Sequence, residues 1–139
     1  MIPVTMAQAC EVLAAQPFSV LLGTRLTDFG PDGVTLELTA RPDLRQQHGY
    51  LHGGVVSYLI DNAITFAAGA ALGPDIVTAA ISVDYVRPAV GDLVAHAWVV
   101  RAGSGRAVLR CDVSTATAAE PVLCAIGQGS VAVRRAPMP

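Results

Sequence analysis

The sequence is short of charge: only 14% of its 139 residues are Asp, Glu, Lys or Arg, whereas about 25% is usual in soluble domains. Hydrophobic residues make up 53%. Disordered chains combine low hydrophobicity with high net charge, so this composition excludes that class. With so few charged side chains, the whole surface of a free monomer would not be polar. We therefore expect another subunit to cover part of the apolar surface.

Basic residues are few, and lysine is absent, because all nine of them are arginines. The net charge of −2 gives no basic surface for nucleic acid, which excludes that partner. Cysteine is scarce as well: Cys10, Cys111 and Cys124 are an odd number without metal-ligand spacing. We expect small buried thiols in a reducing compartment, with no disulfide framework, no metal site and no redox cofactor.

Two targeting features are also missing. Residues 1–5 lack the basic region and apolar core of a signal peptide, so a cytoplasmic protein is expected. The longest apolar run, residues 55–72, holds Asp61 and Asn62 near its centre, where a membrane span does not ordinarily place an acid. The sequence therefore predicts neither secretion nor a membrane span.

No internal repeat or linker-like segment divides the chain, which predicts a single domain over residues 1–139. Alternation of apolar and polar residues at 34–39 indicates a half-buried strand, and the turn before it makes 21–29 its hairpin partner. Four more strand-like runs follow, at residues 76–87, 93–101, 107–115 and 122–133. The sequence thus indicates about six strands, mostly antiparallel.

Helical patterns occupy two segments. Residues 5–16 form a short amphipathic helix with Thr5 as its N-cap and Pro17 ending it. Residues 54–72 form one long helix that is apolar on nearly every face, which predicts burial on all sides. We therefore expect an α+β fold in which a curved antiparallel sheet wraps around one central helix.

Polar residues on this long helix are the exception. Ser57, Asp61 and Thr65 are spaced four apart and form one polar stripe, which reaches Gly53 at the helix start one turn earlier. An ionised carboxylate in an apolar interior costs several kcal/mol unless it is paired, so Asp61 needs an explanation.

Acyl-transfer chemistry is one explanation of the stripe. Free N–H groups at a helix start hold a carbonyl oxygen on which charge develops, and a carboxylate activates water or attacks the carbonyl. Gly53 and Gly54 let a substrate approach the backbone closely, and His52 is expected to fix the loop by a hydrogen bond. A flexible cap and a solvated Asp61 are alternative interpretations that the residues leave open.

Residues 46–63, Gln-Gln-His-Gly-Tyr-Leu-His-Gly-Gly-Val-Val-Ser-Tyr-Leu-Ile-Asp-Asn-Ala, closely resemble the core motif of the hotdog-fold acyl-CoA thioesterases. The phenylacetate-pathway (PaaI-like) branch is the most similar, with His-Gly-Gly, an apolar spacer, then Asp and Ala. Weaker likenesses follow at 82–89, 91–93 and 101–106, so the resemblance covers about residues 20–133. It implies the hotdog fold and hydrolysis of acyl-CoA to a carboxylic acid and coenzyme A.

The resemblance also implies residue roles. The Gly53 N–H would polarise the thioester carbonyl, and Asp61 would be the nucleophile or the general base. Gln46, seven residues before that glycine, would orient the thioester or the water. Some relatives use a Thr one turn after the carboxylate, here Thr65, and others a hydroxyl early in the third strand from the partner subunit, here Thr78. Both hydroxyls remain candidates for holding the attacking water.

Family sites lie between subunits, which implies a dimer, or a dimer of dimers (a homotetramer), and agrees with the shortage of charge. His52, Gly54 and Asn62 are candidate substrate-binding residues, and Asn62 is expected to make a contact across the dimer. Three arginines are candidate contacts for the phosphates of coenzyme A, or alternatively ordinary strand-end charges: Arg87, Arg101 and Arg106. Coenzyme A enters only as part of the substrate, and no separate cofactor is implied.

Two other functions are compatible with this fold. A hydratase or dehydratase on this fold needs a catalytic His beside an acid on the helix, but this helix carries Asp61 without a His. A non-catalytic acyl-CoA-binding protein is the other alternative, and the intact pair of Gly53 and Asp61 argues against it. The acyl group itself, aryl or aliphatic, is left undetermined by the motif.

Overall fold

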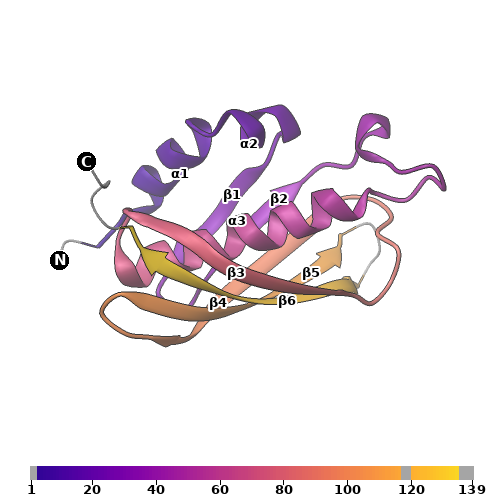
Figure 1. The fold of residues 1–139 in the computed structure, drawn as a ribbon. Coiled ribbons are helices and arrows are strands. Elements are labelled where there is room, and N and C mark those ends of the chain that lie inside the picture. Colours follow the sequence, from indigo (N-terminus) through magenta and orange to yellow (C-terminus); the bar gives the residue numbers. More distant parts are fainter. Residues whose placement is uncertain (1–2, 117–119, 135–139) are drawn as a thin grey trace, which may run out of the picture.

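The computed structural model describes residues 3–116 and 120–134 and has an α+β architecture. The helices are α1 (Met6–Ala14), α2 (Pro17–Leu22) and α3 (Gly53–Leu72), with a short 3-10 helix, η1 (Pro42–Leu44). The strands are β1 (Arg25–Gly30), β2 (Gly33–Leu38), β3 (Ile76–Tyr85), β4 (Leu93–Ala102), β5 (Arg106–Thr115) and β6 (Val122–Val133). Figure 1 shows the sheet curving around α3, which confirms the predicted fold class.

The six strands form one antiparallel sheet in the order β1-β2-β4-β5-β6-β3. Side chains alternate across it, so that every second residue of β2 and β5 points to the core. Leu36 and Leu38 of β2 and Leu109 and Val113 of β5 are fully buried. This buried face packs against α3 and forms one apolar core.

Glycines on β6 let α3 lie close to the sheet. A Cβ atom at Gly127 would lie 2.5 Å from Cγ2 of Ile60, nearer than real Cβ atoms come to another carbon. A Cβ at Gly129 would lie 2.6 Å from the carbonyl oxygen of Ala80 and 3.4 Å from Cδ1 of Ile64. Ile60 and Ile64 are fully buried, so the helix is seated where the strand carries no side chain.

The prediction that the long helix is buried on all sides is wrong for a single chain. The face with Leu59, Ile60 and Ala63 is fully buried, but Ser57 and Asp61 are half-buried. One curved sheet covers only one side of a helix, and α1 and α2 leave the polar stripe partly open. By length and composition α3 would also pass for a membrane span, as core helices do, and half of its most apolar stretch is buried here.

The N-terminal region differs from the prediction after Pro17. Thr5 is the N-cap of α1 as expected, and it forms a capping box with Gln8. Pro17, however, does not only end the first helical segment. It is also the first residue of a second helix, α2, because proline suits the first turn of a helix. Gly23, with φ 75°, ends α2, so β1 starts at Arg25 and not near residue 21.

Strand β3 lies at one edge of the sheet and pairs with β6 alone among the described strands. Several of its large apolar side chains are exposed, among them Val77, Ile81 and Tyr85. An exposed apolar edge strand is a surface that natural proteins usually cover. The edge strand β3 is therefore one place in the fold where the apolar surface expected from the composition is found.

Two of the three thiols are buried, as expected for small apolar side chains. Burial, with a smaller effect of the nearby Asp112 carboxylate, raises the pKa of Cys111 to about 12. Burial also raises the pKa of Cys124, whose Sγ donates to the carbonyl oxygen of Val113 at 3.3 Å. Neither sulfur forms a thiolate at neutral pH.

Candidate active site

Asp61 lies midway along α3 with two threonine hydroxyls beside it. Thr78 of β3 donates a hydrogen bond from Oγ1 to Oδ1 of Asp61 at 2.6 Å. Thr65, one turn along α3, donates from Oγ1 to the carbonyl oxygen of Asp61 at 2.8 Å. The two hydroxyl oxygens are 2.8 Å apart, so both threonines that the sequence left as alternatives belong to one cluster.

The source of the strand hydroxyl differs from what the resemblance implies. In those relatives the partner subunit supplies it, whereas here Thr78 contacts Asp61 of its own chain. Each hydroxyl has one hydrogen, so two hydrogens serve the three short contacts. The second carboxylate oxygen of Asp61, Oδ2, accepts no hydrogen bond from the described residues, which leaves it available to a water or a substrate.

The Asp61 carboxylate opens into a cleft of about 450 Å³ between α2, α3 and the start of β3. Pro17, Phe18 and Ser19 of α2 line it on the α2 side. No Lys, Arg or His in residues 3–116 and 120–134 forms an ion pair with Asp61. A structural acid is usually paired with a cation, whereas the Asp61 carboxylate accepts a single hydroxyl hydrogen bond, from Thr78, and keeps one oxygen without a donor among the described residues.

A hydrogen-bond network fixes α2 beside this cleft. Tyr58 Oη lies 2.6 Å from Oγ of Ser19 and 2.8 Å from Oγ1 of Thr24. Asn62 donates from Nδ2 to both Ser19 Oγ and Tyr58 Oη at 3.2 Å. Asn62, expected to make a contact across a dimer, thus bonds α2 within its own chain. Ser19 is only 1% exposed, and every polar group around it has a partner.

The backbone N–H of Gly53, the first residue of α3, is the second candidate group of the site. His52 is the N-cap, and its Nδ1 accepts the N–H of Gly54 at 2.8 Å, so His52 fixes the loop as expected. The Gly53 N–H has no acceptor within the described residues. Tyr85 donates from Oη to the Gly53 carbonyl oxygen at 2.8 Å. One backbone donor therefore stays available at the positive end of the helix dipole.

Gln46 organises the loop in front of this helix end. Its Oε1 accepts the N–H of His48 at 2.6 Å and of Tyr50 at 3.3 Å. Gln46, Gly53, Tyr85 and other residues line a hollow of about 350 Å³. Gln46 and Gly53 thus share one hollow, and the role of Gln46 in orienting a thioester or a water stays a prediction.

Within one chain, however, Gly53 and Asp61 line different hollows. The helix rises about 1.5 Å per residue, so the offset of eight positions from Gly53 to Asp61 corresponds to about 12 Å. A carbonyl oxygen bound at the Gly53 N–H puts its carbon far beyond the reach of Asp61. The sequence placed the two groups on one side of the helix, but they cannot act on the same carbonyl group in a single chain.

The three candidate arginines are not brought together. Arg87 follows β3 and lines the hollow that contains Gly53. Arg101, near the end of β4, pairs with Val108 of β5, and Arg106 begins β5 and pairs with Ala132 of β6. Both lie toward the end of the sheet opposite to Arg87. No single phosphate group can contact all three within one chain.

Sequence reasoning missed Tyr58 and Tyr85 as parts of the site. Tyr85 falls in a segment that resembles the thioesterases, but nothing in its spacing links it to the Gly53 carbonyl group. Tyr58 lies one turn before Asn62 on α3, and this spacing was a usable signal of a shared polar contact. The partner of that contact, α2, was not predicted.

Comparisons with known proteins show the family and the fold to which this chain is similar. A Halobacterium salinarum protein named "Putative esterase" is 42% identical over 94 residues, which span 63% of this chain and 62% of that protein. The crystal structure of a thioesterase family protein from Silicibacter pomeroyi has a TM-score of 0.85 at 28% identity, covering 91% of this chain and 96% of that one.

The Escherichia coli PaaI protein, from the phenylacetic acid degradation operon, has a TM-score of 0.81 over 90% of this chain and 89% of its own. At 19% identity this likeness shows the shared fold alone. The family model described as Thioesterase superfamily matches residues 48–122, a span that contains Gly53, Asp61 and both threonines. The chain therefore belongs to the thioesterase superfamily.

Proposed function

We propose that the protein hydrolyses an acyl-CoA thioester to a carboxylic acid and coenzyme A. The membership of the superfamily supports thioester or ester hydrolysis, and the acyl-CoA substrate is our extension of it. One observation carries the assignment: Asp61 opens into a cleft, has a free carboxylate oxygen, and is held by the Thr78 hydroxyl instead of a cation. The reaction uses groups of the protein alone, with no separate cofactor.

Asp61 acts on the thioester carbonyl by one of two routes with the same products. As a general base it takes a proton from a water, whose oxygen then bonds to the carbonyl carbon. As a nucleophile it forms an anhydride with the acyl group, which water hydrolyses afterwards. In both routes the C–S bond breaks and the sulfur of coenzyme A leaves with the electron pair and gains a proton.

A second copy of the chain completes the site. The N–H of Gly53 stabilises the negative charge that develops on the carbonyl oxygen, but the Asp61 of the same chain is too far along α3. In a dimer, Gly53 of one protomer can face Asp61 of the other. The exposed apolar edge at β3 supports such an association, and a homodimer then contains two equivalent sites.

The remaining candidates have supporting roles in this proposal. Gln46 orients the thioester beside Gly53, with His52 and Gly54 forming the helix start that the substrate approaches. Asn62 holds α2 against the cleft. Arg87 is placed to contact a phosphate of coenzyme A at the Gly53 hollow, while Arg101 and Arg106 can take part only from another protomer.

The substitution Asp61→Asn tests the assignment. It keeps the shape of the side chain but removes the base, so we expect turnover to fall at least about 100-fold while the fold persists. Release of coenzyme A is followed with a thiol reagent, and folding by circular dichroism. Asp112→Asn, which changes an exposed acid on β5, is the control and keeps full activity.

Near wild-type turnover of Asp61→Asn would refute the assignment. If the unaltered protein binds acyl-CoA in a calorimeter but releases no thiol, the non-catalytic alternative holds instead.

A further inference from the structure

Gln16, between α1 and α2, lines the Asp61 cleft. It is the N-cap residue of α2, but its side chain does not cap the helix. Instead its Oε1 accepts the hydrogen of Ser19 Oγ at 2.6 Å. N–H···O contacts begin at about 2.7 Å, whereas O–H···O contacts reach about 2.5 Å, so the amide oxygen and not the nitrogen faces Ser19. The amide nitrogen, Nε2, therefore points away from Ser19.

A chain of hydroxyl groups fixes the orientation of this amide. Ser19 has one hydrogen, which goes to Gln16, so Tyr58 donates to Ser19 across the 2.6 Å between their oxygens. Tyr58 has no second hydrogen, so Thr24 Oγ1 in turn donates to Tyr58 at 2.8 Å. The amide nitrogen of Asn62 donates to Ser19 and Tyr58 as well. Each hydroxyl hydrogen of the chain thus has one place, and the chain ends at Gln16 Oε1.

Gln16 Nε2 is the side-chain donor of the cleft that remains without an acceptor among the described residues. The other lining residues with a hydroxyl or amide donor already donate within the protein: Ser19, Tyr58, Asn62, Thr65 and Thr78. Asp61 Oδ2 is in the same cleft and accepts no hydrogen bond from the described residues. The cleft therefore offers a ligand an amide donor and a carboxylate acceptor.

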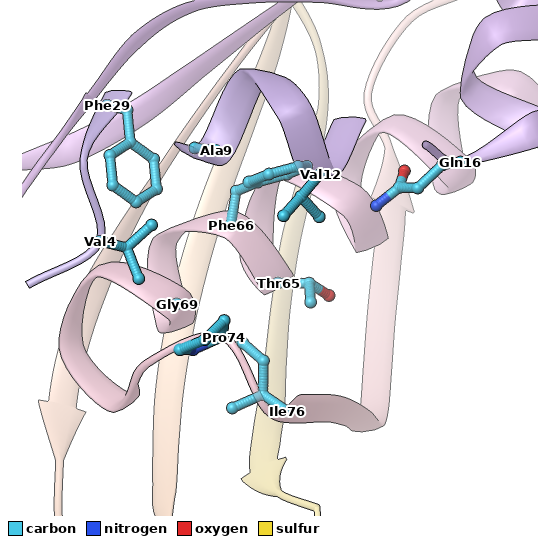
Figure 2. A pocket seen from close by; sticks show the side chains of 10 residues that line it. All are labelled: Val4, Ala9, Val12, Gln16, Phe29, Thr65, Phe66, Gly69, Pro74 and Ile76. Carbon is cyan, nitrogen blue, oxygen red and sulfur yellow. The ribbon is translucent and has the colours of Figure 1, made fainter. Parts of the chain in front are cut away.

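The amide nitrogen of Gln16 lies on the side of the carboxylate cluster. Gln16 and Asp61 line one cleft, together with Thr65 and Thr78. Figure 2 views a neighbouring hollow that Gln16 and Thr65 also line, and it shows the Gln16 nitrogen toward Thr65 and the oxygen turned away. Thr65 is in direct contact with the backbone of Asp61, at 2.8 Å from its carbonyl oxygen.

We infer that Gln16 is a further catalytic residue, whose Nε2 donates a hydrogen bond to the water that Asp61 activates. The inference rests on the proposed function. A water that is held in place needs several polar partners, and the hydrogens of Thr65 and Thr78 both stay within their cluster with Asp61. Gln16 transfers no proton. The water gives its proton to Asp61 Oδ2, its oxygen bonds to the carbonyl carbon, and the amide keeps both hydrogens.

Removal of the donor is the first test. Gln16→Met keeps the length of the side chain without the amide, and Gln16→Glu keeps an acceptor for Ser19 without the donor. We expect both variants to lower kcat about tenfold or more and to change KM less than about twofold, because the water loses its position while substrate binding is kept. Thiol release from acetyl-, hexanoyl- and benzoyl-CoA measures both constants, and circular dichroism checks the fold.

Gln128→Met is the matched control, since Gln128 is exposed on β6 and lies between two glycines that face α3. It keeps kcat and KM. Unchanged kcat in both Gln16 variants would overturn the inference. A raised KM with an unchanged kcat would overturn it as well, since Gln16 would then bind the substrate and not the water.

A double substitution tests whether Ser19 is a positioning residue that acts through Gln16. Ser19→Ala removes the hydrogen that orients the amide, so we expect kcat to fall, but less than in Gln16→Met. Added to Gln16→Met, the same substitution changes kcat little, because the donor that Ser19 orients is already gone. An equal fall of kcat in both backgrounds would overturn the orienting role of Ser19.

The same measurements separate this inference from the proposed function. If the unaltered protein releases no thiol from the three substrates, or if Asp61→Asn keeps full turnover, the proposed function and the inference both fail. If Asp61→Asn abolishes the release while both Gln16 variants keep full kcat, the inference alone fails.

Discussion

The N–H of Gly53 is a single donor that can be removed without changing the rest of the helix. Gly53 is the first residue of α3, a position that proline accepts because its N–H is not needed there. His52, with φ −60° and ψ 136°, already has the extended conformation that precedes a proline. Gly53→Pro therefore deletes the proposed oxyanion donor and keeps the start of the helix, although its Cβ comes to 3.3 Å from the Tyr85 ring.

We expect Gly53→Pro to lower kcat about 100- to 1000-fold, as the loss of one oxyanion donor does. Steady-state thiol release measures it. Gly53→Ala is the matched control, because it brings a similar Cβ to 3.3 Å from the Tyr85 ring but keeps the N–H. An equal fall in both variants would show that crowding at Tyr85, and not the missing donor, is responsible.

At this scale the sequence predicted the site only in part. The spacing of Ser57, Asp61 and Thr65 was sufficient to place an acid on a polar stripe, because helical periodicity is a local property. The Thr78 hydroxyl lies on another element, and its contact with Asp61 depends on how α3 sits on the sheet. Such a contact is tertiary, so the residues alone left both threonines open.

Among the elements, the contact between α3 and β6 is the most sensitive to substitution. In Gly127→Ala the new Cβ would lie 2.5 Å from Cγ2 of the fully buried Ile60, so helix and strand have to separate. Overpacking of this kind costs about 1–3 kcal/mol, and we expect that loss in the free energy of unfolding measured with urea. Gly30→Ala on β1, where nothing lies within 4 Å, is the control and shows no such loss.

Helix α2 is the element that the sequence did not predict. Pro17 suits both the end of one helix and the start of the next, and local pattern does not separate the two cases. What holds α2 is a set of contacts with α3, chiefly Ser19 with Tyr58 and Asn62. The five strands after residue 33 and the central helix were predictable, since each has its own apolar pattern.

At the scale of the whole molecule, the proposal requires that each site take Gly53 from one chain and Asp61 from another. Mixing two inactive variants tests this. Asp61→Asn and Gly53→Pro are unfolded and refolded together, and we expect activity to return to about a quarter of the wild-type level, because half of the dimers then hold one intact site.

Each variant refolded alone is the control and stays inactive. A refolded mixture that is as inactive as its components would show that one chain supplies both groups.

The separation of Gly53 and Asp61 along one rigid helix also has a consequence for when the protein becomes active. In this proposal a single folded chain holds two half-sites, and neither of them hydrolyses a thioester alone. On our proposal, catalysis starts when two chains meet, so at low abundance the rate rises more steeply than the amount of protein. Synthesis level and dilution would then regulate this hydrolase without any ligand.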